Sequence, residues 1–290
     1  MSLDVIILTK NEAVNLPACL DSLKSFAEPP GVTVIDDGSD DETVALAGAA
    51  GAAVFDRRLD SFAAQRNFAL EKSQADWVFF LDADERFTPT LARSVERTIE
   101  RATARAAPVC GSCLRRNFAF GRRQRFGPLA ADRVVRLFPR REVRWEGLVH
   151  ERPVSLCPVV RLGGALEHRT YRDWSQFLEK LVKYAKLWAV EAAQAGRRAT
   201  ALKAAIRAAT AFGKTFVCQL GFLGGPTTWA LCLYNCCYTL SKYLFLSQRA
   251  GPSGPTPSPT SNSTPSSSQG PPSGSASQSC GPSSDPPPAP

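Results

Sequence analysis

Histidine and methionine are scarce in this 290-residue chain, which has two histidines and one methionine. Cys110 and Cys113 have the spacing of a zinc half-site, but no second cysteine pair and no nearby histidine accompany them, which argues against structural zinc. The chain opens on Met1-Ser2-Leu3-Asp4 without the basic and apolar regions of a signal peptide. We therefore expect a cytoplasmic protein, in which cysteines stay reduced.

Charge is almost absent from the C-terminal stretch 251–290, in which Asp285 is the only charged side chain among 12 of the 22 prolines and 13 serines. Such a stretch buries too little apolar surface to offset its ordering entropy, so we expect disorder there. The remaining part is long enough for a sizeable core, which excludes a small disulfide-stapled module, a wholly disordered protein and a fibrous repeat. It carries all 35 Lys and Arg against 26 of the 27 acids, a net charge of +9 that favours an anionic partner.

Short apolar runs alternate with helical patterns between Leu3 and Glu85. Strands are predicted at 3–8, 32–35, 52–55 and 77–81, and helices at 15–23, 42–50 and 62–72. Because strands and helices alternate at this rhythm, the pattern predicts a doubly wound α/β sheet.

Polar clusters follow three of these strands, at 9–12, 36–40 and 82–85. In such sheets, ligands bind beyond the carboxyl ends of the strands, so we expect the three clusters to converge on one edge. Asp82-x-Asp84 suits a Mg²⁺ or Mn²⁺ ion that bridges a diphosphate and stabilises it as a leaving group. Surface acids at strand ends are common, however, so this motif alone is weak evidence.

Asp36 and Asp37 are placed to accept hydrogen bonds from a base or ribose, because ionised carboxylates only accept. The alternative is a turn at Gly38, with the following aspartates capping the next helix.

Farther along the chain, helices are predicted at 93–105, where arginines recur at every fourth position on a solvated face, and at 174–195. A basic amphipathic helix is predicted at 197–214, and no charge occurs from 215 to 241. That uncharged stretch is long enough to span a bilayer, but glycines and Pro226 interrupt it. The pattern favours docking on an anionic membrane face over a buried helical pair or a true span.

Four motifs occur in the order seen in family 2 glycosyltransferases. They are Thr9-Lys10-Asn11-Glu12, Val34 to Thr43, Gln65 to Leu70, and Trp77 to Arg86. The chain therefore resembles that family, and within it the bacterial lipopolysaccharide-core β-glucosyltransferases, through segments 132–138, 149–152 and 168–180. The resemblance covers about residues 1–246 and leaves out the Pro/Ser-rich tail.

This resemblance implies a GT-A-type doubly wound mixed sheet with a Rossmann-like nucleotide-binding half, and transfer with inversion. Together with the composition and charge pattern, it divides the chain into an expected catalytic domain at 1–172, a helical membrane-associating appendage at 173–248 and a disordered tail at 249–290. The donor would be a nucleotide-diphosphate sugar, with glucose by analogy, and a divalent cation, Mg²⁺ or Mn²⁺, would assist. The acceptor would be a lipopolysaccharide-core or lipid-linked saccharide at the cytoplasmic membrane face.

The same resemblance implies roles for particular residues. Those expected to bind the donor are Thr9, Asn11, Glu12, Asp36, Asp37, Arg66 and Asp82. Asp84 would bind the metal, with Asp82 contacting metal or ribose. An inverting transfer needs a carboxylate base, for which Glu151 is preferred over Asp132, with His150 orienting the base or joining the metal. His168 is given a structural role, and Arg133 and Arg136 are expected to hold diphosphate or an anionic acceptor.

Two other functions fit parts of the pattern. Arginines beside Phe118, Phe120 and Phe126 are compatible with stacking on nucleic-acid bases. A non-catalytic membrane scaffold is the second alternative. The acidic strand ends would repel nucleic-acid phosphates without a metal, so we expect no nucleic-acid partner.

Overall fold

The computed structural model describes residues 2–147, 151–171 and 173–249. His150 and the tail predicted to be disordered lie outside these ranges. The strands are β1 (Leu3–Thr9), β2 (Gly31–Asp36), β3 (Ala53–Asp56), β4 (Trp77–Asp82), β5 (Glu85–Phe87), β6 (Cys110–Ala119), β7 (Arg122–Arg123), β8 (Asp132–Pro139), β9 (Arg144–Glu146), β10 (Arg152–Val154) and β11 (Val159–Tyr171). The helices are α1 (Leu16–Ser22), α2 (Thr43–Ala49), α3 (Phe62–Lys72), α4 (Pro89–Ala104), α5 (Trp174–Gln194), α6 (Ala201–Gly213) and α7 (Gly225–Arg249).

One mixed sheet organises the N-terminal part, with strand order β3-β2-β1-β4-β8-β6-β11-β5 and β7 paired to β6. The first four of these strands are parallel. Strand β8 runs antiparallel to both β4 and β6, whereas β11 is parallel to β6. The parallel half confirms the predicted α/β sheet, and the antiparallel β8 makes the whole sheet mixed.

Alternate residues of the central strands pack on opposite faces of this sheet, because side chains alternate along a strand. Val5 and Phe79 belong to the core beneath α1 and α4, whereas Ile6 and Phe80 belong to the core beneath α3. Covering both faces explains why these strands read as continuous apolar runs rather than alternating ones.

The predicted helix at 93–105 begins earlier, at Pro89. Thr88 is its N-cap, accepting a hydrogen bond from the backbone N–H of Leu91, and proline is well suited to the first helical position. The predicted basic helix at 197–214 begins later, at Ala201, because Thr200 caps it through the N–H of Lys203. In both places a threonine that prefers the cap position sets the start of the helix.

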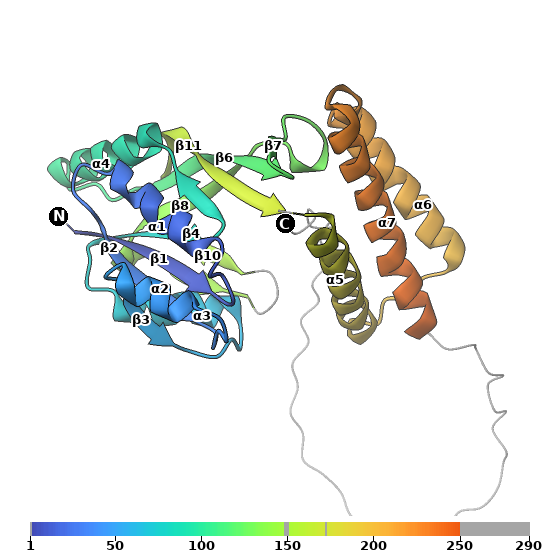
Figure 1. Cartoon of the computed structure of the whole chain (residues 1–290), viewed down its shortest axis with the longest axis horizontal. Helices are drawn as coiled ribbons and strands as arrows, with labels where there is room; N and C mark the ends of the chain where they lie inside the picture. Colours follow the sequence, from blue (N-terminus) through green and yellow to red (C-terminus); the bar gives the residue numbers. More distant parts are fainter. Residues whose placement is uncertain (1, 148–150, 172, 250–290) are drawn as a thin grey trace, which may run out of the picture.

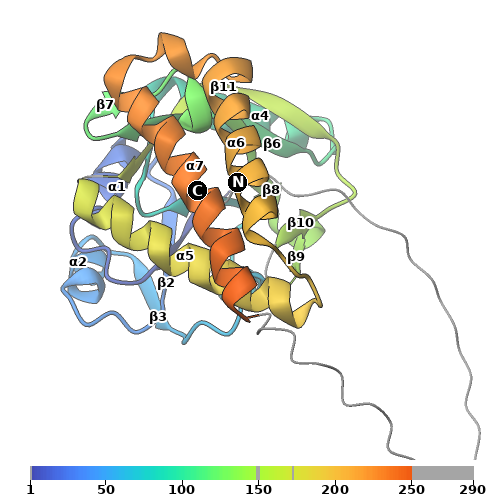
Figure 2. The same cartoon turned by 90° about the vertical axis from the view of Figure 1, so that its right-hand side faces the viewer.

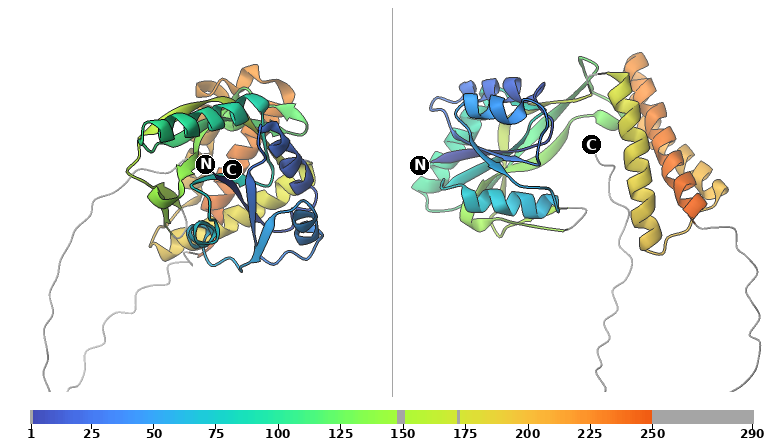
Figure 3. Two further views of the ribbon diagram at one scale, coloured as in Figure 1. Left: turned by 90° about the vertical axis from the view of Figure 1, so that its left-hand side faces the viewer. Right: turned by 60° about the horizontal axis from the view of Figure 1, so that its bottom comes forward.

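Helices α5, α6 and α7 stand together beside the sheet, with α6 and α7 packed against each other (Figures 1 and 2). They are joined to the sheet where β6 and β11 end, as the right panel of Figure 3 shows. There Tyr171 and Ala119 pack with Phe177 of α5 and Leu231 of α7, and the rings of Phe177 and Tyr234 stack with centroids 3.5 Å apart.

The uncharged stretch at 215–241 is broken, as its glycines indicate. A π-helical turn at Lys214–Cys218 ends α6, Leu220 has a left-handed backbone with φ of 54°, and α7 begins after Gly224. Within the described ranges, none of the helices combines the length and apolar character that crossing a bilayer requires.

Candidate functional site

The three polar clusters meet at one edge of the sheet, as predicted. Strand β1 lies between β2 and β4, with Thr9 in register with Asp36 on one side and Leu8 in register with Asp82 on the other. Because these strands are parallel, their carboxyl ends bring Thr9, Asp36 and Asp82 to the same edge.

Asp36 is almost completely buried, with 1 % of its surface exposed. Its Oδ1 accepts hydrogen bonds from the hydroxyls of Thr9 at 2.8 Å and Ser39 at 2.6 Å, and its Oδ2 accepts one from the Ser39 backbone N–H at 2.6 Å. These bonds fix the carboxylate at the end of β2. The role of Asp36 in base recognition stays a prediction.

Asp37 is held by the adjacent loops. Its Oδ2 lies 2.7 Å from the Lys10 ammonium, and its Oδ1 accepts a hydrogen bond from the Leu59 backbone N–H at 2.7 Å. The bond from Lys10, followed by the bond from Leu59, holds the pKa of Asp37 below its ordinary value of 3.8. A carboxylate so fixed stays ionised at neutral pH.

Asn11 and Glu12 join the first loop to the second. The Asn11 backbone N–H donates to Ser39 Oγ at 2.8 Å, and its side-chain oxygen accepts from the Asp40 backbone N–H at 3.0 Å. Asn11 has φ of 56°, which asparagine tolerates better than most residues. The Glu12 backbone N–H donates to Thr43 Oγ1 at 2.8 Å. Asn11 and Glu12, which were predicted to bind the nucleotide sugar, therefore hold the loop after β1 against the loop after β2.

Asp82 stands at the end of β4 between two arginines. Its Oδ2 is 2.5 Å from Arg136 on β8, and its Oδ1 is 4.0 Å from Arg66 on α3. Loss of hydration opposes ionisation, but the charges of Arg136 and then Arg66 outweigh it and hold the pKa of Asp82 well below its usual range. Glu85, which is fully buried, shares Arg136 at 2.8 Å, and burial raises its pKa.

Asp84 has a different surrounding. Its Oδ2 lies 3.2 Å from Nε2 of His168, which β11 places beside it, and the Arg169 backbone N–H donates to the Asp84 carbonyl at 2.9 Å. The aspartate motif therefore contains one carboxylate balanced by arginines and one that faces an imidazole.

The second ring nitrogen of His168 determines what Nε2 offers. His168 Nδ1 lies 2.7 Å from Asn117 Oδ1, and the amide nitrogen of Asn117 donates to the Ala130 carbonyl at 3.3 Å. The hydrogen-bond network thus assigns the Asn117 oxygen as acceptor and the His168 Nδ1 as N–H donor. With this tautomer, Nε2 is an acceptor that faces an acceptor oxygen of Asp84, an arrangement that a bound cation would stabilise.

The preferred base, Glu151, pairs with Arg66. Its Oε1 is 2.5 Å from Arg66, whose guanidinium lies over the Trp145 ring at 4.5 Å. Arg66 thus brings Asp82 and Glu151 together, although they are far apart in the sequence. Arg66 Nε and Trp145 Nε1 are buried and have no hydrogen-bond partner within the described ranges.

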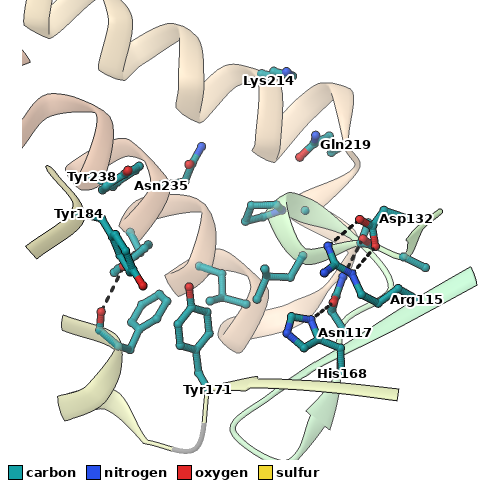
Figure 4. Close-up of a pocket in the computed structure, with 18 residues that line it drawn as sticks. Arg115, Asn117, Asp132, His168, Tyr171, Tyr184, Lys214, Gln219, Asn235 and Tyr238 are labelled. Atoms are coloured by element: carbon teal, nitrogen blue, oxygen red, sulfur yellow. Dashed lines mark hydrogen bonds and ion pairs between the residues drawn. The ribbon is translucent and has the colours of Figure 1, made fainter. Parts of the chain in front are cut away.

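The other base candidate, Asp132, begins β8 and is held by two bonds from Arg115, from Nε at 3.0 Å and from Nη2 at 2.8 Å. Asp132, Arg115 and His168 line a cavity of about 480 Å³ between the sheet and the C-terminal helices (Figure 4). The structure therefore brings Arg66, Asp82 and Glu151 into one group and places Asp132 in this cavity.

Two arginines that were expected to hold a diphosphate or an anionic acceptor have partners within the protein, and their role in binding stays a prediction. Arg136 is buried, and its Nη2 bonds Asp82 and Glu85. Arg133 donates to the Ser112 carbonyl at 3.2 Å.

The position of His168 beside Asp84 is the main feature that the sequence analysis missed. Histidine is scarce in this chain, which could have drawn attention to His168 as a functional candidate. His168 lies on β11, which pairs with β5, the strand just after the aspartate motif. His168 is in register with Glu85 of β5.

The model of the family described as "Glycosyl transferase family 2" matches residues 4–152. The lipopolysaccharide core biosynthesis glycosyltransferase LpsC of Rhizobium meliloti is 28 % identical over 211 residues, which cover 68 % of this chain and 74 % of LpsC. An uncharacterized glycosyltransferase of Rickettsia felis is 33 % identical over 94 residues, 32 % of each chain. The match thus spans about a third of the length of that relative.

Among solved structures, S. aureus TarS aligns over 86 % of this chain and 55 % of its own, with 15 % identity and a TM-score of 0.40. The family match runs from β1 through β9 and ends at Arg152, so it includes the strand-end clusters, Arg66 and Glu151. It confirms the GT-A-type fold expected from the motifs, and the chain belongs to glycosyl transferase family 2.

Proposed function

We propose that this protein is an inverting hexosyltransferase. It moves a hexose, glucose by analogy, from a nucleotide-diphosphate sugar to a lipopolysaccharide-core or lipid-linked saccharide at the cytoplasmic face of the membrane. The observation that carries the proposal is the convergence of Asp36, Asp82 and Asp84 on one edge of the sheet within the family match. Similarity to LpsC supports the choice of a core saccharide.

The part of the site that would bind the nucleotide sugar contains both hydrogen-bond acceptors and hydrogen-bond donors. The fixed carboxylates of Asp36 and Asp37 face the loops that would enclose the base and ribose. Arg66 supplies a buried guanidinium whose Nε has no partner among the described residues, and arginine forks match the oxygens of a diphosphate. Asp82 is held by Arg136 and Arg66, so its orientation at the centre of the site is fixed.

The residues present fit a divalent cation at Asp84. Among described residues, no group of three or more His, Cys, Asp and Glu side chains is arranged to hold a metal. Mg²⁺ and Mn²⁺ sites of this type, however, usually combine one or two carboxylates with substrate phosphates. Asp84 Oδ2 and His168 Nε2, 3.2 Å apart and both acceptors, would supply the protein donors, with Asp82 adjacent. The ion would act as a Lewis acid that neutralises the departing diphosphate.

Glu151 is the proposed base. It would take the proton of the acceptor hydroxyl as that oxygen forms a bond to the anomeric carbon, while the bond from this carbon to the diphosphate oxygen breaks. Arg66, 2.5 Å from Glu151, orients the carboxylate. Asp132 is the second candidate, and its two bonds from Arg115 make it the less available base.

The C-terminal helices supply the proposed membrane contact. Residues 192–249 contain seven Lys and Arg and no Asp or Glu. Leu202 and Ile206 are exposed on α6, directly beside Lys203 and Arg207 of the same helix. Exposed apolar side chains next to basic ones are typical of helices that lie on an anionic membrane surface.

Thermal shift with a panel of nucleotide sugars, with and without Mn²⁺, tests the donor assignment. We expect one donor to raise the melting temperature only when Mn²⁺ is present. Asp84→Asn should lose this shift, and Asp21→Asn, an exposed aspartate on α1 that pairs with Lys24, should retain it. A full metal-dependent shift in Asp84→Asn would refute the site.

Sedimentation with vesicles of anionic and of neutral lipid tests the membrane contact. We expect binding to anionic vesicles only, with binding weakened by salt because exposed charges are screened. Equal binding to both kinds of vesicle, or to neither, would contradict this part of the proposal.

A further inference from the structure

The cavity between the sheet and the C-terminal helices has no role assigned so far. Its volume, about 480 Å³, lies within the range of about 300–1,000 Å³ that is usual for ligand pockets. One wall comes from β6, β8 and β11, and the opposite wall from α5, α7 and the π-helical turn (Figure 4). The cavity therefore lies where the catalytic domain meets the part of the chain beyond the family match.

His168 joins this cavity to the aspartate motif. The ring is part of the cavity wall, and its Nε2 is 3.2 Å from Asp84 Oδ2. Asp132 and Arg115 line the same side. A molecule in the cavity would thus contact His168, which pairs with Asp84, and Asp132, the second candidate for the base.

Four tyrosines line the cavity, three from helices α5 and α7 and one from the end of β11. They are Tyr171, Tyr184, Tyr234 and Tyr238. Burial raises the pKa of Tyr171 to about 12 and also raises that of Tyr238, so these phenols stay protonated at neutral pH. The Tyr234 hydroxyl donates to the Phe177 carbonyl at 3.2 Å. The rings of Tyr184 and Tyr238 combine a flat apolar face with a hydroxyl, which suits a pyranose with its C–H faces and hydroxyl edges.

Two amides add hydrogen-bonding groups. Asn235 of α7 and Gln219 line the cavity, and Gln219 Oε1 is buried without a hydrogen-bond partner among the described residues. A buried acceptor without a partner is costly, and a ligand hydroxyl would supply the missing donor. A purely hydrocarbon ligand would leave this atom unpaired, so the wall favours a polyhydroxylated ligand.

The charge at the rim favours an anionic ligand. Lys214 lines the cavity and is exposed, and no ion pair involves it among the described residues. Arg115, in contrast, is engaged by Asp132. Lys214 is therefore available to a phosphate or carboxylate on a bound molecule.

We propose that this cavity is the acceptor site and that it binds a saccharide with an anionic substituent, which contacts Lys214. The inference rests on the proposed function, because it takes the nucleotide edge of the sheet to be the donor side. It adds that the helices beyond the family match form half of the acceptor site.

Saturation-transfer NMR with three probes tests this inference. The probes are deacylated lipopolysaccharide-core oligosaccharide, the same oligosaccharide after phosphatase treatment, and intact rough-type lipopolysaccharide in micelles. We expect the deacylated oligosaccharide to bind the full chain without a nucleotide. Asn235→Leu, which removes an amide at similar volume, should weaken it about tenfold, whereas Gln248→Leu, an exposed amide on the same helix, should not.

Lys214→Gln should weaken the phosphorylated oligosaccharide about fivefold and leave the phosphatase-treated one unchanged. Binding of the micellar lipopolysaccharide alone would overturn the inference that the saccharide is recognised. Binding that resists both Asn235→Leu and Lys214→Gln would overturn the assignment of the cavity. A failure of the proposed function can be told apart from a failure of this inference. In the first case, no nucleotide sugar would raise the melting temperature of the wild-type protein in the presence of Mn²⁺, while the saccharide would still bind.

Discussion

Arg136 is the side chain on which the electrostatics of the site depend. Its Nη2 bonds Asp82 at 2.5 Å and Glu85 at 2.8 Å, and Glu85 has no exposed surface. A second cation near Glu85 is Arg115, with Nη1 at 3.8 Å. Arg136→Met preserves the apolar length of the side chain but leaves Glu85 with this more distant partner.

Breaking a buried ion pair by removing one partner costs about 3–5 kcal/mol, because the remaining charge is left uncompensated. We therefore expect Arg136→Met to lower the free energy of unfolding by about that amount. For a folded part of this size, each kcal/mol corresponds to about 2–4 °C in melting temperature, so the melting temperature should fall by about 6–20 °C.

The pH dependence gives an independent check. Burial already raises the pKa of Glu85 above its ordinary value of 4.5, and loss of the Arg136 charge would raise it further. A raised pKa means that the folded state binds a proton more tightly than the unfolded state, so lowering the pH through that pKa stabilises the folded variant. The difference in the free energy of unfolding between the wild type and Arg136→Met should therefore be largest at neutral pH and shrink toward pH 5.

Urea unfolding followed by tryptophan fluorescence at several pH values measures both effects. Arg133→Met is the matched control, since Arg133 is an exposed arginine on the same strand whose side chain donates to the Ser112 carbonyl. Arg136→Met combined with Glu85→Gln should recover part of the loss, because the unpaired charge is then absent. A loss below about 1 kcal/mol without pH dependence would refute the reasoning.

Three further results are expected from local geometry. Gly164→Ala should cost about 1–3 kcal/mol in urea unfolding, because Gly164 has φ of 80° and a Cβ there would lie 2.5 Å from the Leu91 nitrogen; unchanged stability would contradict that backbone. Thr200→Ala should cost about 1 kcal/mol by removing the N-cap of α6, whereas Thr200→Ser should not; equal losses in both would show that the hydroxyl does not cap. Asp37→Asn should destabilise at neutral pH by about 1 kcal/mol. Because the Lys10 bond lowers the pKa of Asp37 below 3.8, this deficit in stability should begin to shrink as the pH falls below about 4 and should vanish once the folded protein is protonated there, and a deficit independent of pH would not come from the charge.

The strand-end cluster could be predicted from the sequence because its signals are local. Each strand from β1 to β4 is a short apolar run, and the polar residues that follow it are adjacent in the sequence. The parallel arrangement then brings Thr9, Asp36 and Asp82 to one edge. Only the topology rule for α/β sheets is needed to pass from the sequence to this cluster.

The rest of the site could not be predicted because it depends on pairing between distant segments. Strand β11 pairs with β5, and its register places His168 opposite Glu85, which lies much earlier in the chain. Nothing in the local pattern of 159–171 specifies that partner, since the segment has two glycines and mixed polarity. The buried state of Arg136 likewise depends on a strand, β8, that runs antiparallel between β4 and β6.

Strand β11 also connects the two ligand sites that the fold suggests. The Arg169 backbone N–H donates to the Asp84 carbonyl at 2.9 Å, and farther along the strand the Tyr171 carbonyl accepts from the Phe120 backbone N–H at 2.9 Å. The Tyr171 ring packs against Phe177 of α5 with centroids 4.5 Å apart. One strand, which begins beyond the family match, therefore holds the backbone of the aspartate motif at one point and the helices at the next. The contact with α5 and the hydrogen bond to the Asp84 backbone are therefore made by residues of one strand, Tyr171 and Arg169.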